Sequence, residues 1–197
     1  MQPEPSPVVF RAYDERQQPS LRAVRLGELL SEWVRNEVYA VTAGLAEDTA
    51  RPANILPVSD ALRYVSHMLP ARQPLYLWRY PLSLELQLWT SGWELRVAPR
   101  WLQTRHFSQR RELLRTLQHL VAHMDVDLLV GPARRPPISV RHALPEYDRW
   151  PILYLGARLY QAFAWKSVLD ERQVIMLPWA QGLWVEQGQT KGWRCVR

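Results

Sequence analysis

The sequence predicts an α+β fold: a largely antiparallel sheet with two long helices and one or two shorter ones packed on it. Residues 82–97 alternate apolar and polar side chains on both sides of Thr90-Ser91-Gly92, as two strands with one buried face do when a short turn joins them. Residues 20–46 and 108–124 instead repeat apolar side chains every three or four positions, as amphipathic helices do. The chain lacks the regular strand–helix alternation of a doubly wound sheet, so α+β is favoured.

The first third of the chain predicts one strand followed by two helices. Residues 8–13, VVFRAY, form the strand. The first helix begins with Ser20 as its N-cap and continues to about Ala46, and Ser59 caps a shorter helix over 59–69. The apolar stripe of the first helix consists of Leu26, Leu29, Leu30, Trp33 and Val34.

The remainder of the chain predicts more strands and a second long helix. Residues 126–131 are a short apolar run typical of a buried strand, whereas three prolines in 131–137 predict a loop. Residues 152–171 begin as a strand or tight turn and become helical after Gly156. The other expected elements are a strand at 75–79, the helix at 108–124 with Ser108 as its cap, and a closing hairpin formed by 173–178 and 182–187.

Length and composition are typical of one globular domain. The chain has 197 residues, of which 47% are hydrophobic, enough to build a core. We expect residues 1–7 to form a flexible, proline-rich tail and residues 8–197 to form a single domain. The only cysteine, Cys195, cannot form an internal disulfide, and neither a signal peptide nor a membrane-spanning run is evident. These features predict a cytoplasmic protein that does not contact a membrane.

The charge balance is basic, with a net charge of +6. Only Lys166 and Lys191 among the basic residues are lysines, a bias that a GC-rich genome explains better than selection for phosphate binding. The resulting positive field nevertheless favours an acidic partner.

The sequence contains no complete catalytic motif and no glycine-rich phosphate loop, so we expect neither enzymatic activity nor a cofactor. His119 and His123 share one helical face, and Asp125 and Asp127 follow them, which is a spacing that could hold zinc. Zinc proteases, however, need glutamate where this chain has Leu120. A structural role at a helix C-terminus is therefore favoured, and a metal-dependent enzyme is the least favoured hypothesis.

Arginines cluster around the start of the second long helix, over residues 100–115, beside Trp101 and Phe107. Such a cluster could contact phosphates while the aromatic rings stack on bases, but it is equally typical of a solvated helix face. A nucleic-acid-binding module is accordingly the alternative hypothesis, and nucleic acid is an unlikely partner. The arginines concerned are Arg100, Arg105, Arg110 and Arg111.

The ten tryptophans favour a protein-binding role over an enzymatic one. Trp150, Trp179 and Trp193 lie in proline-, glycine- or turn-rich surroundings, and we expect them to be partly exposed. Exposed tryptophan near arginine is typical of protein-interface hot spots. The candidate partner-binding residues, all in predicted loops, are Arg134, Arg135, Tyr147, Asp148, Trp150 and Trp179.

The layout resembles the α+β immunity proteins of bacterial polymorphic-toxin and type VI secretion systems. The resemblance is carried by the tryptophan-rich hairpin LQLWTSGWELRV, by RWPILYLG, and by the late hairpin QVIMLPWAQGLWV. It implies a cytoplasmic protein that binds and neutralises a cognate toxin by occlusion. Immunity proteins against nucleases are often acidic, whereas this chain is basic, so the resemblance implies a toxin with an acidic surface or a steric block.

Overall fold

The computed structural model describes residues 7–44, 52, 54–80, 82–98, 107–162, 173–177 and 182–186. Within them, every strand belongs to one nine-stranded sheet in the order β2-β3-β4-β5-β1-β6-β7-β9-β8, and every neighbouring pair is antiparallel. The predicted α+β class is therefore confirmed. The strands are β1 (Val8–Tyr13), β2 (Ala40–Thr42), β3 (Leu75–Arg79), β4 (Leu82–Trp89), β5 (Gly92–Val97), β6 (Leu128–Ala133), β7 (Ile152–Leu155), β8 (Gln173–Leu177) and β9 (Gly182–Glu186).

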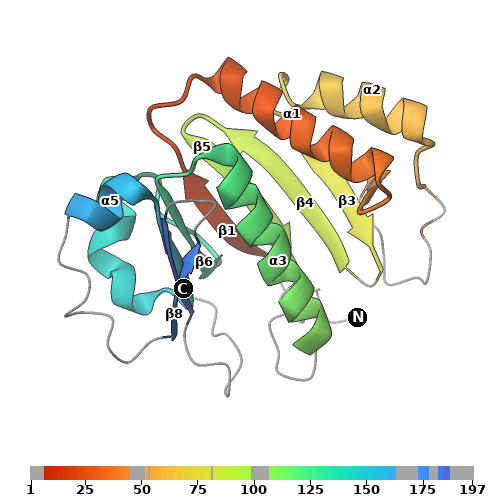
Figure 1. The fold of residues 1–197 in the computed structure, drawn as a ribbon. Helices are drawn as coiled ribbons and strands as arrows, with labels where there is room; N and C mark the ends of the chain where they lie inside the picture. The colour runs from red at the N-terminus through yellow and green to blue at the C-terminus, as the bar shows by residue number, and fades with distance from the viewer. Residues whose placement is uncertain are drawn as a thin grey trace.

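Three longer helices cover one face of the sheet where β1 to β5 lie, as Figure 1 shows. They are α1 (Pro19–Arg35), α2 (Val58–Met68) and α3 (Phe107–Met124). The main core forms between them and the sheet, because the apolar stripe of α1 and the alternate leucines of β4 point at each other. No helix in the described ranges is long and apolar enough to cross a membrane.

A second core lies on the opposite face of the sheet, over β6, β7 and β9. It is covered by α4 (Val140–Ala143), the 3-10 helix η3 (Leu144–Arg149) and α5 (Ala157–Ala162). Leu128 of β6 belongs to this core and its neighbour Leu129 to the first one. Burial on both faces explains why this strand is an unbroken apolar run rather than an alternating one.

Several predicted elements are confirmed. The strands at 8–13 and 75–79, and the hairpin over 82–97, have the expected bounds. The closing hairpin and the strand-to-helix change at Gly156 are also present. The part of 152–171 that follows Ala162 lies outside the described residues, as does nearly all of the expected tail at 1–7.

Three expectations about element ends are wrong. The first long helix ends at Arg35 instead of about Ala46, because the chain turns at Glu37, which has a φ of 54°, and forms β2. The N-caps are Gln18 and Pro57, not Ser20 and Ser59, and neither provides a side-chain capping bond.

The predicted loop at 131–137 is also wrong in part, since β6 continues through Gly131 and Pro132 to Ala133. Gly131 has a φ of 155°, and a Cβ there would lie 2.7 Å from Cδ1 of Phe10. Glycine thus lets β6 stay close to β1 where their register shifts.

Two buried tyrosines should make the fold sensitive to alkaline pH. Burial raises the pKa of Tyr39 and of Tyr154 to about 12, and the charges of Asp125 and Asp127 add to the effect at Tyr154. In the unfolded chain, the pKa of tyrosine is about 10. The stability gained by keeping these two hydroxyls protonated in the fold is therefore complete below about pH 10 and is lost as the pH rises toward about 12. Thermal unfolding midpoints should therefore fall between pH 10 and 12. The Tyr39→Phe variant should show a shallower decline, and an unchanged decline would contradict the assignment.

Candidate functional site

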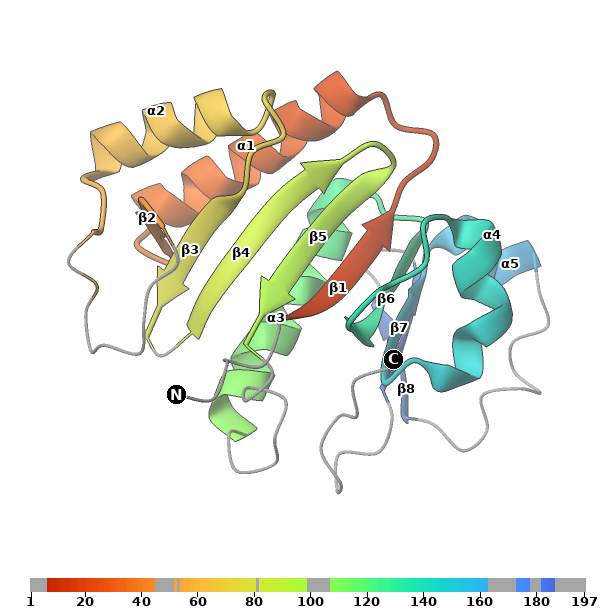
Figure 2. The same ribbon diagram turned by 180° about the vertical axis from the view of Figure 1, so that it is seen from behind.

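One side of the sheet carries polar and aromatic side chains that face away from α1, α2 and α3. Figure 2 shows β3, β4, β5 and β1 on that side, with no described helix in front of them and α3 behind. We call these outward side chains the open face. They are Tyr76, Trp78, Ser83, Glu85, Gln87, Trp89, Arg96 and Arg11. Val9, Glu94 and Tyr13 point to the same side of the sheet but are buried.

A chain of alternating charges crosses three strands of the open face. The register places Glu85 beside Arg96 and Glu94 beside Arg11. Arg96 pairs with Glu85 at 2.7 Å and with Glu94 at 3.2 Å, and Glu94 also pairs closely with Arg11. Each carboxylate therefore has a guanidinium partner, and the four charges sum to zero. Cross-strand pairs of this kind stabilise the sheet and fix its register.

Arg11 connects this charge chain to the segment that follows β6. Its guanidinium donates to the backbone oxygens of Pro136 and Pro137, at 2.9 and 2.7 Å, and lies 4.7 Å from the centre of the Trp89 ring. The Tyr13 hydroxyl donates to the same Pro137 oxygen at 2.6 Å. Burial raises the pKa of Tyr13, so that hydroxyl keeps the proton it donates.

We call residues 134–139 the arginine loop. Arg134, Arg135 and Ile138 are exposed, Ile138 to 73%. Beyond the loop, the backbone N–H of Val140 donates to Glu15 at 3.2 Å. No carboxylate in the described part of the chain pairs with Arg134 or Arg135. Side chains of β1 thus hold the centre of the loop, and Glu15 holds the residue after its end. Arg134 and Arg135 are exposed to solvent.

The other predicted partner-binding residues are not gathered on this surface. Tyr147 and Asp148 lie in η3, and Tyr147 is partly buried against the second core. Trp150 is 1% exposed and donates its indole N–H to the Ala143 oxygen at 3.2 Å, so its expected exposure is wrong. The ring fills the second core, which the sequence alone does not reveal. Trp179 and Trp193 lie outside the described residues.

The arginines proposed for nucleic-acid binding are only partly available. Arg110 is 2% exposed, and a phosphate could not reach it. Arg111 is exposed on α3, while Arg100 and Arg105 lie outside the described residues.

The two histidines proposed for zinc lie exposed on α3. Nε2 of His123 is 3.1 Å from the Arg25 oxygen, and Asp127 pairs with Arg158 at 3.2 Å. Across the described ranges, no three His, Cys, Asp or Glu side chains lie close enough to hold a metal ion.

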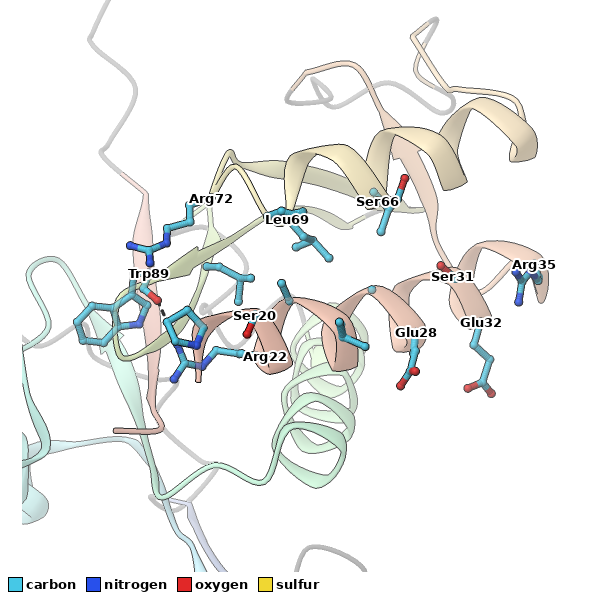
Figure 3. Close-up of a pocket in the computed structure, with 17 residues that line it drawn as sticks. Ser20, Arg22, Glu28, Ser31, Glu32, Arg35, Ser66, Leu69, Arg72 and Trp89 are labelled. Carbon is cyan, nitrogen blue, oxygen red and sulfur yellow. Dashed lines mark hydrogen bonds between the residues drawn. The ribbon is translucent and has the colours of Figure 1, made fainter. Parts of the chain in front are cut away.

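A groove of about 950 Å³ lies between α1, α2 and the end of β4 (Figure 3). Leu69 and Val65 lie along it, and Glu28, Glu32 and Arg35 give it a rim of mixed charge. Arg22 at one end is 1% exposed, and its donors are used by Asp14 and by four backbone oxygens. The buried guanidinium of Arg22 therefore stabilises the fold and has no donor left for a ligand in this groove. The open face with the arginine loop is the better candidate site.

The fold and this surface define an α+β protein with a polar sheet face and a basic loop beside it. No protein-family model matches the chain, and no curated protein matches it. Among solved structures, the Pseudomonas aeruginosa T6SS protein PA0821 is similar over 92% of this chain, at 11% identity and a TM-score of 0.47. The matched part covers 65% of that protein, so this chain spans less than two thirds of its length.

Proposed function

We propose that this protein is a cytoplasmic immunity protein that binds a cognate bacterial toxin and neutralises it by occlusion, without catalysis. The observation that carries the proposal is the arginine loop, in which Arg134 and Arg135 are exposed and pair with no carboxylate of the described residues while Arg11 and Tyr13 hold the loop's backbone. The toxin would be of the polymorphic or type VI secretion kind that the sequence resemblance implies.

A loop that is already ordered is well suited to tight binding. Ordering a flexible segment on association opposes binding, and prior immobilisation removes much of that cost. Arg134 and Arg135 can each make two parallel hydrogen bonds to a carboxylate, and Ile138 offers apolar contact beside them. Arginine next to apolar surface is a common composition for the residues that dominate protein interfaces.

Co-expression tests the proposal, with the product of the gene directly upstream of this chain's gene as the candidate toxin. The parent protein should restore growth, and the Arg134→Glu/Arg135→Glu variant should bind the toxin at least about a hundredfold more weakly, since two charge-assisted contacts become repulsive. The Arg63→Glu/Arg111→Glu variant is the matched control, because both residues are exposed on the helical layer and the change in net charge is the same. Equal killing with and without the parent protein would contradict the proposal.

A further inference from the structure

We infer that Arg22, a buried side chain of α1, is a positioning residue for the arginine loop, because its hydrogen bonds fix both supports of that loop. The consequence for toxin binding rests on the proposed function. The positioning itself is a property of this chain, and it can be measured without a partner.

The two supports of the loop come from β1 and from the turn that follows β1. Arg11 and Tyr13 of β1 donate to backbone oxygens at the centre of the loop. In the turn over residues 14–17, Glu15 accepts the backbone N–H of Val140, directly after the loop, at 3.2 Å. A displacement of the β1 side chains or of this turn would therefore release one part of the loop.

Arg22 fixes the turn that carries Glu15. Its guanidinium donates to the backbone oxygens of Asp14 and Gln17, at 2.5 and 2.9 Å, and it pairs with the Asp14 carboxylate at 3.5 Å. The same carboxylate accepts the backbone N–H of Gln17 at 3.0 Å. Both ends of the turn are thus bonded to one buried side chain, and Glu15 lies between those ends. The bonds of Arg22 therefore keep the Glu15 carboxylate within reach of Val140.

Arg22 also fixes the end of β4, next to Arg11. It donates to the Trp89 oxygen at 3.4 Å and to the oxygen of the following residue at 3.2 Å. The Trp89 ring lies 4.7 Å from the Arg11 guanidinium and packs edge-on against Tyr13. The indole N–H of Trp89 donates to the Ala12 oxygen at 3.3 Å, which attaches the ring to β1. Because a guanidinium carries its donors in a rigid fork, one side chain can bond to both segments at once.

Amide hydrogen exchange of the protein alone tests the inference, with one reporter for each support. The Val140 amide reports release of the end of the loop, and the Trp89 indole N–H reports loosening of the ring beside Arg11. Arg22→Lys keeps the positive charge beside Asp14, but a single ammonium cannot replace the donors of the fork. Both protons should therefore exchange at least about tenfold faster in this variant.

Leu117→Ala is the matched control, because Leu117 is fully buried in α3 and its truncation destabilises the whole fold without removing a bond to the turn. Local opening does not depend on global stability, so the Val140 amide should exchange at the parent rate in this control. Glu15→Ala should speed the exchange of Val140 by removing its acceptor. Combining Glu15→Ala with Arg22→Lys should give less than the product of the two single increases, since Arg22 acts on Val140 through Glu15.

The outcomes separate this inference from the proposed function. Parent-like exchange in Arg22→Lys, an equal acceleration in Leu117→Ala, or single increases that multiply in the double variant would each overturn the inference. A candidate toxin that the parent protein neither binds nor neutralises would overturn the proposed function and leave the positioning of the loop standing. Where the toxin is bound, Arg22→Lys should weaken the binding by about tenfold although Arg22 is buried, because the loop must then be ordered on association.

Discussion

Replacement of Arg11 by lysine is expected to release the arginine loop while preserving most of the fold. A single ammonium keeps the positive charge beside Glu94, but it cannot also donate to two carbonyl oxygens and lie over the Trp89 ring. Amide hydrogen exchange at residues 140–143 should become at least about tenfold faster, because local opening no longer breaks these bonds. On the proposed function, the affinity for the toxin should fall by about tenfold although Arg11 itself need not touch the toxin.

Arg11→Ala should add a stability loss of about 2 to 3 kcal/mol, since it also removes a charged partner from Glu94, which is 6% exposed. Tyr13→Phe is the milder companion variant, as it removes only the hydrogen bond to the Pro137 oxygen. If the Arg11→Lys variant keeps the parent protein's amide hydrogen-exchange rates near the loop, the Arg11 side chain does not hold the loop.

The Arg22→Met variant is expected to lose about 3 to 5 kcal/mol of unfolding free energy, because it leaves a buried carboxylate unpaired. Arg22 is 1% exposed, and it donates to Asp14 and to backbone oxygens of Gln17, Trp89 and Thr90. Methionine fills similar space but replaces none of these bonds. For a chain of this length, the thermal midpoint should fall on the order of 10 °C.

The pH dependence of that loss identifies its cause. Burial raises the pKa of Asp14, while Arg22 and the Gln17 N–H lower it, so removing Arg22 should raise this pKa further. A carboxyl group whose folded pKa is raised favours the fold at low pH and loses that contribution as the pH rises. The deficit of Arg22→Met should therefore be smaller at about pH 5 than at about pH 7.

Arg35→Met is the matched control, since Arg35 is exposed on the same helix and should change stability by less than about 0.5 kcal/mol. An Arg22→Met variant with a parent-like midpoint would contradict the assigned role of the buried pair.

Local patterns predicted most of the secondary structure because they are properties of neighbouring residues. The leucines of β4 alternate in the sequence and are buried in the structure, and so is the stripe of α1 from Leu26 to Val34. The candidate site was predicted less completely. Arg134 and Arg135 are exposed as expected. Trp150 is buried by a layer of short helices that no pattern in the sequence predicted.

The sequence by itself determined the α+β class, the two long helices and the hairpin of β4 and β5, because periodicity of two or 3.6 residues is a local signal. Only the tertiary structure decided that β1 lies between β5 and β6, which brings Arg11 to oxygens 125 and 126 residues away. That placement pairs the charges of the open face and fixes the arginine loop above them. Contacts between segments so far apart depend on which strands become neighbours, and alternation along one strand carries no information about its partner.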